Sequence, residues 1–182
     1  MTLLSAADSQ LVIVDIQEKL APAIHDGEGA LKATLLLVAA AKRLGVPISV
    51  TEQYPKGLGA SVAPLRAALP HDAAVLEKMH FSAMREPAIT AHLVTHKRRS
   101  MIMCGMEAHV CVLQTALDAK AAGYDVYLVR DGVGSRKPLS VETALRRMEH
   151  AGIHLVTSEM VVFEWMERAG TDDFKAIAPL LK

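Results

Sequence analysis

The sequence lacks an excess of charge of either sign, because 20 lysines and arginines are balanced by 20 aspartates and glutamates. A neutral chain has no strong overall field, which argues against nucleic acid and anionic membranes as partners. It also lacks any apolar run near the roughly 18 residues that a membrane-spanning helix requires. Its first ten residues, MTLLSAADSQ, lack the basic segment and apolar stretch of a secretory signal. We therefore expect no membrane and no nucleic-acid partner.

Cysteine is scarce, with only Cys104 and Cys111 in 182 residues. Two cysteines cannot form a disulfide framework, so we expect a reducing, cytoplasmic location. No linker, low-complexity tract or internal repeat divides the chain. The length, with 51% apolar and 22% charged residues, is typical of one globular domain, which we expect over residues 1–182.

Short apolar runs alternate with segments of helical periodicity along the chain. We expect strands at residues 11–16, 47–51, 74–79, 100–104, 125–129 and 152–157. We expect helices at 28–44, 61–69 (capped by Ser61), 87–96, 109–122, 141–151, 158–168 and 172–182, and a loop at 54–59. This alternation predicts an α/β fold with a parallel sheet covered by helices on both faces. Such sheets bind ligands outside the carboxyl ends of their strands.

Three reactive side chains fall at predicted strand ends. Asp15 ends the first strand, where a carboxylate is costly unless it is paired or used; the alternative is a turn cap. Lys78 ends the third, where a lysine that reaches into solvent is the alternative. Cys111 lies in the turn after the fourth, where a helix N-terminus favours the thiolate. Its alternative is a small core residue, which is what we expect for Cys104.

The three groups are more informative together than singly. A cysteine nucleophile needs a base, which an aspartate in a partly desolvated site can supply. A neighbouring ammonium group keeps that carboxylate charged and favours the thiolate. The combination of Asp15, Lys78 and Cys111 therefore indicates covalent catalysis by a thiol.

At these residues the sequence resembles the isochorismatase-like cysteine hydrolase superfamily, and the resemblance covers nearly the whole chain. The family pattern is an aspartate ending the first strand, a lysine after the third and a cysteine at the helix after the fourth. The segments TEQYPKGLG, GMEAHVCVLQTALD and GYDVYLVRDGVGSR most resemble the isochorismatase domain-containing subgroup. The resemblance implies a Rossmann-type, three-layer α/β/α sandwich with six parallel strands. It also implies a homo-oligomer, a dimer or tetramer, with the terminal helices in its interface.

The same resemblance implies a mechanism. A cis peptide bond between Met106 and Glu107 places the amide of Glu107 beside that of Cys111 as an oxyanion hole. Asp15 takes the thiol proton, Lys78 orients Asp15, and a small amide or related acyl substrate is hydrolysed through a thioester. Nicotinamidases of the superfamily carry a metal-binding aspartate and histidines after the second strand. This chain has EQYP at residues 52–55 instead, so we expect no metal and no cofactor.

Three loop residues near the trio, Gln17, Tyr54 and Phe81, are candidates for substrate binding. His109, which flanks the nucleophile, is a fourth candidate, and a structural role in the turn is its alternative. A second hypothesis is a binding or scaffold protein that retains the fold without turnover. A third, redox chemistry at Cys111, is weakened because no resolving cysteine is adjacent.

Three further motifs have ordinary structural interpretations. His92 and His96 have the i, i+4 spacing of metal ligands, but the glutamate of H-E-x-x-H and a third ligand are missing, so we expect a solvated helix face. The glycines of Gly132–Gly134 lack the third glycine of a dinucleotide motif, which favours a loop. The basic run at residues 97–99 is expected to be a solvated turn.

Overall fold

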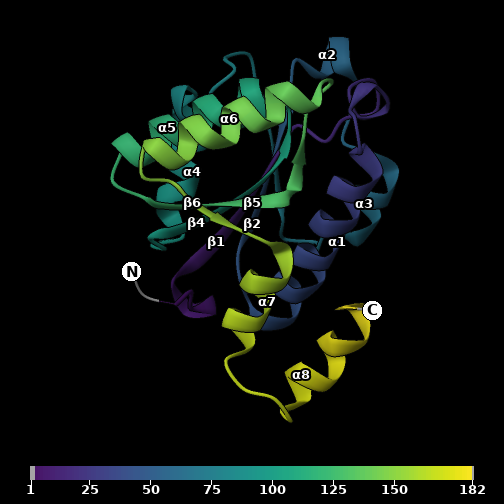
Figure 1. Ribbon diagram of the computed structural model, residues 1–182, viewed down its shortest axis with the longest axis vertical. Helices are drawn as coiled ribbons and strands as arrows, with labels where there is room; N and C mark the ends of the chain where they lie inside the picture. Colours follow the sequence, from purple (N-terminus) through teal and green to yellow (C-terminus); the bar gives the residue numbers. More distant parts are fainter. Residues whose placement is uncertain (1–2, 182) are drawn as a thin grey trace.

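A computed structural model describes residues 3–181. Six parallel strands form one sheet in the order β3-β2-β1-β4-β5-β6, which confirms the predicted fold class (Figure 1). The strands are β1 (Ser9–Val14), β2 (Ile48–Gln53), β3 (Ala74–Lys78), β4 (Ser100–Met106), β5 (Asp125–Gly134) and β6 (His154–Val156). The strand order reverses between β1 and β4, and in open parallel sheets this is where ligands bind. Asp15 follows one of these strands and Cys111 follows the other.

Helices cover both faces of the sheet (Figure 1). One face carries α1 (Gly27–Leu44), α3 (Ala63–Ala68), α7 (Ser158–Met166) and α8 (Asp172–Ile177). The opposite face carries α4 (Pro87–Thr95), α5 (Leu113–Ala121) and α6 (Pro138–His150). A single helical turn, α2 (Pro55–Leu58), follows β2. Short 3-10 turns occur at Ala6–Asp8, Ala21–Ala23, Ala83–Arg85 and Ala178–Leu181.

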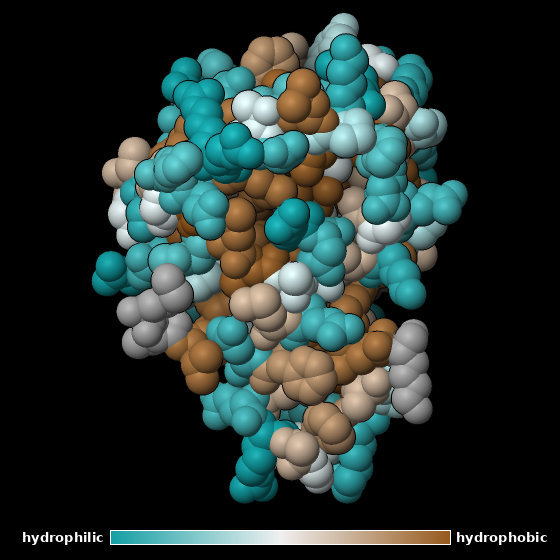
Figure 2. All heavy atoms as spheres, viewed as in Figure 1, coloured by the Kyte–Doolittle hydropathy of each residue, from teal (hydrophilic) through white to brown (hydrophobic). Residues whose placement is uncertain are grey.

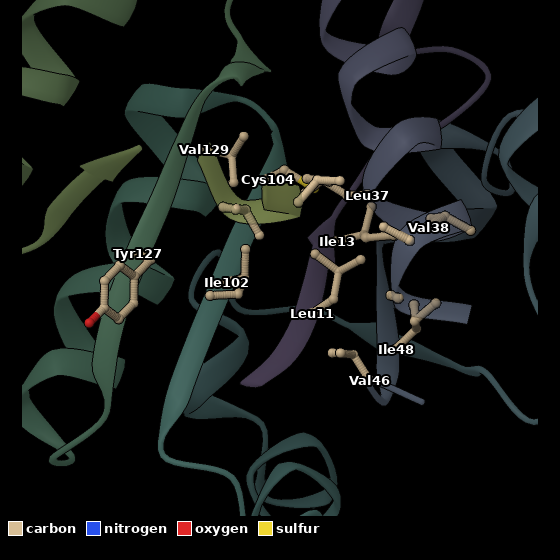
Figure 3. Packing of buried hydrophobic residues seen from close by; sticks show 14 of the residues in the cluster. Leu11, Ile13, Leu37, Val38, Val46, Ile48, Ile102, Cys104, Tyr127 and Val129 are labelled. Carbon is tan, nitrogen blue, oxygen red and sulfur yellow. The ribbon is translucent and has the colours of Figure 1, made fainter. Parts of the chain in front are cut away.

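The central strands have side chains buried on both faces, because successive residues of a strand point to opposite sides of the sheet. Leu11 and Ile13 of β1 pack under α1, whereas Val12 and Val14 pack under the other helical layer. Figure 3 shows the α1 side of this core, in which Cys104 lies among aliphatic side chains. Cys104 is therefore the core residue that the sequence predicts.

The strands nearest the site are longer than the sequence suggests. β4 continues through Gly105, and Gly132–Gly134 belong to β5 rather than to the predicted loop, because Val133 pairs with Gly105 across a register shift. Gly105 has φ +127°, and any side chain there would collide with the backbone of Val14. A glycine at this position thus allows β1 and β4 to approach closely beside the strand-order reversal.

Several predicted elements need correction. The expected loop at 54–59 contains α2, whose first residue is a proline, as suits a helix start. Ser61 does not cap α3, because its hydroxyl and amide both donate to Glu52 Oε1 and Val62 precedes the helix. The last predicted helix is divided into α8 and a 3-10 turn at Ala178–Leu181, and Lys182 lies outside the described residues.

The two histidines of α4 are also placed differently from the prediction. His92 and His96 are half-buried, and the Nε2 atoms of both rings lie within 3.3 Å of Ser49 Oγ. Partial burial, followed by the charges of His92 and Arg98, lowers the pKa of His96. These histidines lie against Ser49 near the first residue of β2 and do not form a solvated face.

Candidate active site

The carboxyl ends of β1, β2 and β3 bring Asp15 and Lys78 together in the interior. Asp15 adopts a left-handed conformation with φ 53°, which aspartate tolerates better than most residues. Its Oδ2 lies 2.8 Å from Lys78 Nζ, and neither side chain is exposed to solvent. Its Oδ1 accepts a 2.7 Å hydrogen bond from Thr51 Oγ1. The lysine that reaches into solvent is therefore excluded. The turn cap is excluded too, because within residues 3–181 the Asp15 carboxylate contacts side chains and accepts no hydrogen bond from a backbone amide.

Oxygen atoms surround the buried ammonium group of Lys78. Besides the Asp15 carboxylate, Nζ approaches Gln53 Oε1 at 2.6 Å and the carbonyl oxygens of Phe81 and His80 at 3.0 and 3.3 Å. The 2.8 Å contact between Nζ and Oδ2 of Asp15 is an ion pair. Because a buried cation must be paired and hydrogen-bonded to be tolerated, this cage explains how Lys78 can be buried.

Glu86 holds the loop that supplies two of these carbonyl groups. Its Oε1 accepts hydrogen bonds from the amides of Met79 and His80, at 2.8 and 2.9 Å, and lies 2.9 Å from His80 Nδ1. These bonds, the backbone ones first, lower the pKa of Glu86 to about 2. The sequence analysis did not identify Glu86, because its role depends on how the loop folds back.

Cys111 sits in a π-helical turn (Ala108–Val112) between β4 and α5, and it is buried. Such turns are rare in proteins, and those that occur often lie at functional sites. Burial, followed by the negative charge of Asp15, raises the pKa of this thiol to about 12, and the charge of Lys78 opposes the rise. The predicted lowering of its pKa is therefore wrong for the free protein. Desolvation and a neighbouring carboxylate outweigh the effect of a helix terminus.

Burial also raises the pKa of Asp15, although Lys78, Thr51 and Cys111 all favour its charged form. The resting pair is thus a neutral thiol beside a carboxylate whose basicity is increased. A more basic carboxylate is a better proton acceptor, which suits a general base.

Gln53 links the ammonium group and the thiol, and the sequence analysis gave it no role. Its Oε1 accepts from Lys78 Nζ and lies 3.9 Å from Cys111 Sγ. Its Nε2 donates to Met79 O at 2.9 Å, so reversing the amide would bring donors against the ammonium group. The signal in the sequence was a glutamine two residues beyond the predicted strand at 47–51, and in the structure it is the last residue of β2.

Gln17 has a structural role rather than the expected contact with substrate. Its Nε2 donates to the carbonyl oxygens of Gln53 and Gly59, and its Oε1 accepts from the amide of Gln53. The side chain is completely buried. Gln17 fixes the backbone of Gln53 and thereby positions the side-chain amide of Gln53, whose Oε1 faces Lys78.

The other residues predicted to bind substrate are close in the chain to residues of the site. Tyr54 and Phe81 are about half exposed and follow Gln53 and Lys78 by one and three positions. His109 is half-buried, with Nδ1 3.0 Å from Ser135 Oγ.

Glu107 is joined to Met106 by a cis peptide bond at the end of β4. Its carboxylate accepts from the Arg136 amide at 3.2 Å and from Arg136 Nε at 2.9 Å. Its carbonyl oxygen accepts from the amides of Val110 and Val112, which closes the π-helical turn. The backbone carbonyl of Glu107 therefore closes the turn that carries Cys111, and its carboxylate ties the start of this turn to Arg136.

Comparisons with known proteins agree with this architecture. The isochorismatase domain model matches residues 9–160. A Phytophthora sojae protein described as a secreted isochorismatase effector is 38% identical over 96% of this chain and 84% of its own length. Isochorismatase domain-containing protein 2 of Danio rerio is 35% identical over 98% of this chain and 89% of its own.

Two solved structures have the same fold with a TM-score of 0.93. A Caenorhabditis elegans protein described as MAR1 ribonuclease is 36% identical and covers 99% of this chain and 92% of its own. The YcaC gene product of Escherichia coli, described as an octameric hydrolase of unknown specificity, is 26% identical and covers 100% of this chain and 90% of its own.

Proposed function

The chain belongs to the isochorismatase family of hydrolases, and from that premise we propose a cysteine hydrolase that cleaves small amides or related acyl compounds through a thioester. The observation that carries the proposal is the buried cluster in which Asp15 pairs with Lys78 and its charge acts on the Cys111 thiol. No metal enters the mechanism, because the end of β2 offers Glu52 and Gln53 in place of histidines, and Glu52 binds Ser61.

The first half-reaction forms a thioester. Asp15 accepts the proton of Cys111 as the sulfur attacks the substrate carbonyl carbon. The backbone amides of Glu107 and Cys111 donate to the resulting oxyanion, an interaction worth about 10²–10³ in rate for one donor. As the C–N bond breaks, Asp15 returns the proton to the leaving amine, and the acyl group remains on Cys111.

The second half-reaction releases the acid. Water gives a proton to Asp15 and attacks the thioester carbonyl carbon. The C–S bond then breaks, and the thiolate recovers that proton from Asp15. Lys78 remains an ammonium group throughout and holds Asp15 in position, while Gln53 fixes the ammonium group.

The remaining parts of the proposal are the surroundings of the site and the location of the protein. The proposal assigns contact with the substrate to Tyr54 and Phe81, which follow Gln53 and Lys78 in the chain and are about half exposed, and to His109, two residues before Cys111. Two unpaired cysteines support a cytoplasmic location. Among residues 3–181, no helix combines the length and apolar character needed to cross a bilayer.

The test is a panel of small amides assayed with wild type, Cys111→Ala and Cys104→Ala. Activity should disappear in Cys111→Ala and persist in Cys104→Ala, whose thiol lies in the core on the α1 side. Mass spectrometry of quenched wild type should find the acyl group on the Cys111 peptide. Full activity of Cys111→Ala would reject the covalent mechanism. Substrate binding without turnover or acylation would favour the scaffold hypothesis.

A further inference from the structure

Two features of the molecule lie outside the active site. A groove of about 1310 Å³ runs beside β5, between α1 and α6, and Figure 2 shows it as a hydrophobic hollow. The second feature is polar and lies where α4 packs against the start of β2. It gathers two imidazole rings and a hydroxyl group around one point.

The two histidines of α4 direct their Nε2 atoms at the same oxygen. His92 Nε2 lies 3.2 Å from Ser49 Oγ, and His96 Nε2 lies 3.3 Å from it. Residues four apart lie on one face of a helix, and the two ring centroids are 4.7 Å apart. In a tetrahedral zinc site with bonds of about 2.1 Å, neighbouring ligand atoms are about 3.4 Å apart. The nitrogen–oxygen separations found here are close to that value.

The chemistry of these three groups selects the kind of ion. Imidazole suits Zn²⁺, Cu²⁺ and Ni²⁺, whereas Mg²⁺ and Ca²⁺ prefer carboxylate and carbonyl oxygens. Both rings are half-buried, so water can supply a fourth ligand. Within residues 3–181, no group of three or more His, Cys, Asp or Glu side chains has the arrangement of a metal site. With only two imidazoles and a neutral hydroxyl group, we expect weaker binding than in structural zinc sites.

A buried oxygen on the neighbouring strand also favours a cation over an anion. Val12 of β1 pairs with Ser49, so Gln10, two residues earlier, lies on the same face of the sheet. Its Nε2 donates to Arg98 O just after α4. Its Oε1 is buried and has no hydrogen-bond partner among the residues that the structure describes. The unsatisfied group near this end of α4 is thus an acceptor, which would repel an anion.

The basic run after α4 acts in the opposite sense and limits the affinity. Arg98 is close enough for its charge to act on His96, and its Nη1 donates to Ala6 O. Arg99 is paired with Asp125, and Lys97 is exposed. This positive charge disfavours ions held by charge alone. It therefore adds to the preference for an ion held by coordination bonds to imidazole.

We propose that His92, His96 and Ser49 bind one divalent transition-metal ion, such as Zn²⁺, which fastens α4 to β2. The site is separate from the active site, because Ser49 precedes Gln53 by four residues, or about 13 Å at roughly 3.3 Å per residue. The ion is structural and takes no part in the hydrolase mechanism. The sequence predicts no third ligand for the histidine pair, because the hydroxyl group comes from a distant strand.

Isothermal titration calorimetry with Zn²⁺ tests the proposal near pH 7.5, where ordinary imidazole, with a pKa of about 6.5, is mostly neutral. Wild type should bind one ion per chain at this site. His92→Gln, His96→Gln and Ser49→Ala should each weaken the binding by about tenfold or more. Mg²⁺ in place of Zn²⁺ should give no binding at these residues.

Two variants control for zinc bound elsewhere. His150→Gln changes an exposed histidine in the last turn of α6 and should bind as wild type does. Cys111→Ala should also bind as wild type does, which separates this site from the active-site thiol. Zn²⁺ at about a hundred times its dissociation constant should raise the thermal midpoint of wild type by about 5 °C and leave that of His92→Gln unchanged. Circular dichroism verifies that each variant folds.

Three outcomes would overturn the proposal. They are no zinc binding by folded wild type, an unchanged affinity in His92→Gln, His96→Gln or Ser49→Ala, and an equal loss of affinity in His150→Gln or Cys111→Ala. None of them depends on hydrolysis of a substrate, so the metal site and the hydrolase can fail separately.

Discussion

Asp15 Oδ2 and Lys78 Nζ lie 2.8 Å apart with both side chains shielded from solvent. The two charges come from the ends of β1 and β3, which are separated in the sheet by β2. Thr51 and Gln53 of that intervening strand provide the hydrogen bonds that make the buried pair tolerable.

Breaking this pair should strongly destabilise the fold. We expect Lys78→Met or Asp15→Asn to lower the free energy of unfolding by about 3–5 kcal/mol, because each leaves an uncompensated buried group. The double variant should lose less than the sum of the two single losses. Urea denaturation measures this, and Arg146→Met, which removes the exposed pair with Glu142, should change little. A wild-type midpoint in Lys78→Met would contradict the account.

The thiol of Cys111 should resist alkylation in the free protein. Its pKa is raised to about 12, so labelling by iodoacetamide near pH 8 should be slower than that of a free thiol and should increase steadily toward high pH. Asp15→Asn removes the second cause of this rise and should shift the profile to lower pH. Cys104, buried among aliphatic residues with a pKa also raised to about 12, is the internal control and should not respond.

The same shift predicts a loss of stability in alkali. Since the folded-state pKa of Cys111 lies above the ordinary 9.0, the folded state keeps its proton longer than the unfolded state does. The contribution of the protonated thiol to folding stability is complete below pH 9 and disappears as pH rises toward 12.

Rapid labelling of Cys111 at neutral pH would contradict the raised pKa and would show that the thiol is activated before substrate binds.

Substitutions of Gln53 should move the Cys111 profile in opposite directions. Gln53→Met removes the oxygen that faces the thiol and should lower the midpoint pH of alkylation by about one unit. Gln53→Glu places a second carboxylate there and should raise it by a similar amount. A general loss of packing would shift both variants in the same direction.

Gln10→Met provides a matched control for Gln53. Gln10 is also a buried glutamine of a central strand, but its Nε2 donates to Arg98 O at the opposite end of the sheet. Its alkylation profile should equal that of wild type. Coincident profiles for Gln53→Met, Gln53→Glu and wild type would show that Gln53 does not affect the thiol.

Glu86 should stabilise the loop after β3 only while it is charged. Its pKa falls from 4.5 to about 2 on folding, so the stabilisation is present above pH 4.5 and disappears as pH falls toward 2. We expect Glu86→Gln to be less stable than wild type at pH 7 and equal to it near pH 2. Hydrogen exchange of the Met79 and His80 amides, together with urea denaturation, measures this.

An exposed carboxylate makes a suitable comparison for Glu86. Glu18 pairs with Arg66 at the surface, and Glu18→Gln should have little effect at either pH. An equal loss in Glu86→Gln at pH 7 and pH 2 would mean that its charge is not the stabilising factor.

The sequence predicted the arrangement of the strands better than their lengths. Apolar runs at 11–16 and 100–104 located β1 and β4, because buried parallel strands require continuous hydrophobic residues. The sequence did not predict the extension of β5 through Gly134. Residues 133–134 pair with β4 only beyond a shift in register, and the local sequence pattern does not reveal such long-range pairing. The sequence predicts a helix cap at Ser61, whereas its hydroxyl donates to Glu52 of β2, a partner that local pattern cannot reveal.

Within the site, the sequence identified the reactive residues, and the structure showed their hydrogen-bond partners and their burial. Asp15, Lys78 and Cys111 could be selected because each stands at a strand end in an α/β pattern. The sequence analysis assigned no role to Gln53 and predicted a substrate contact for Gln17, because an amide can serve structure or substrate equally well until its partners are known.

Hydrophobic periodicity and strand-end chemistry therefore predicted the parallel sheet and the candidate trio from the sequence alone, and three sequence segments carried the family resemblance. Tertiary structure decided that the thiol is neutral at rest, that Gln53 lies between the ammonium group and the sulfur, and that a groove opens beside β5. The physical reason is the separation along the chain between the residues that interact. Periodicity is read from neighbouring residues, whereas desolvation and buried charge depend on side chains that only folding brings together.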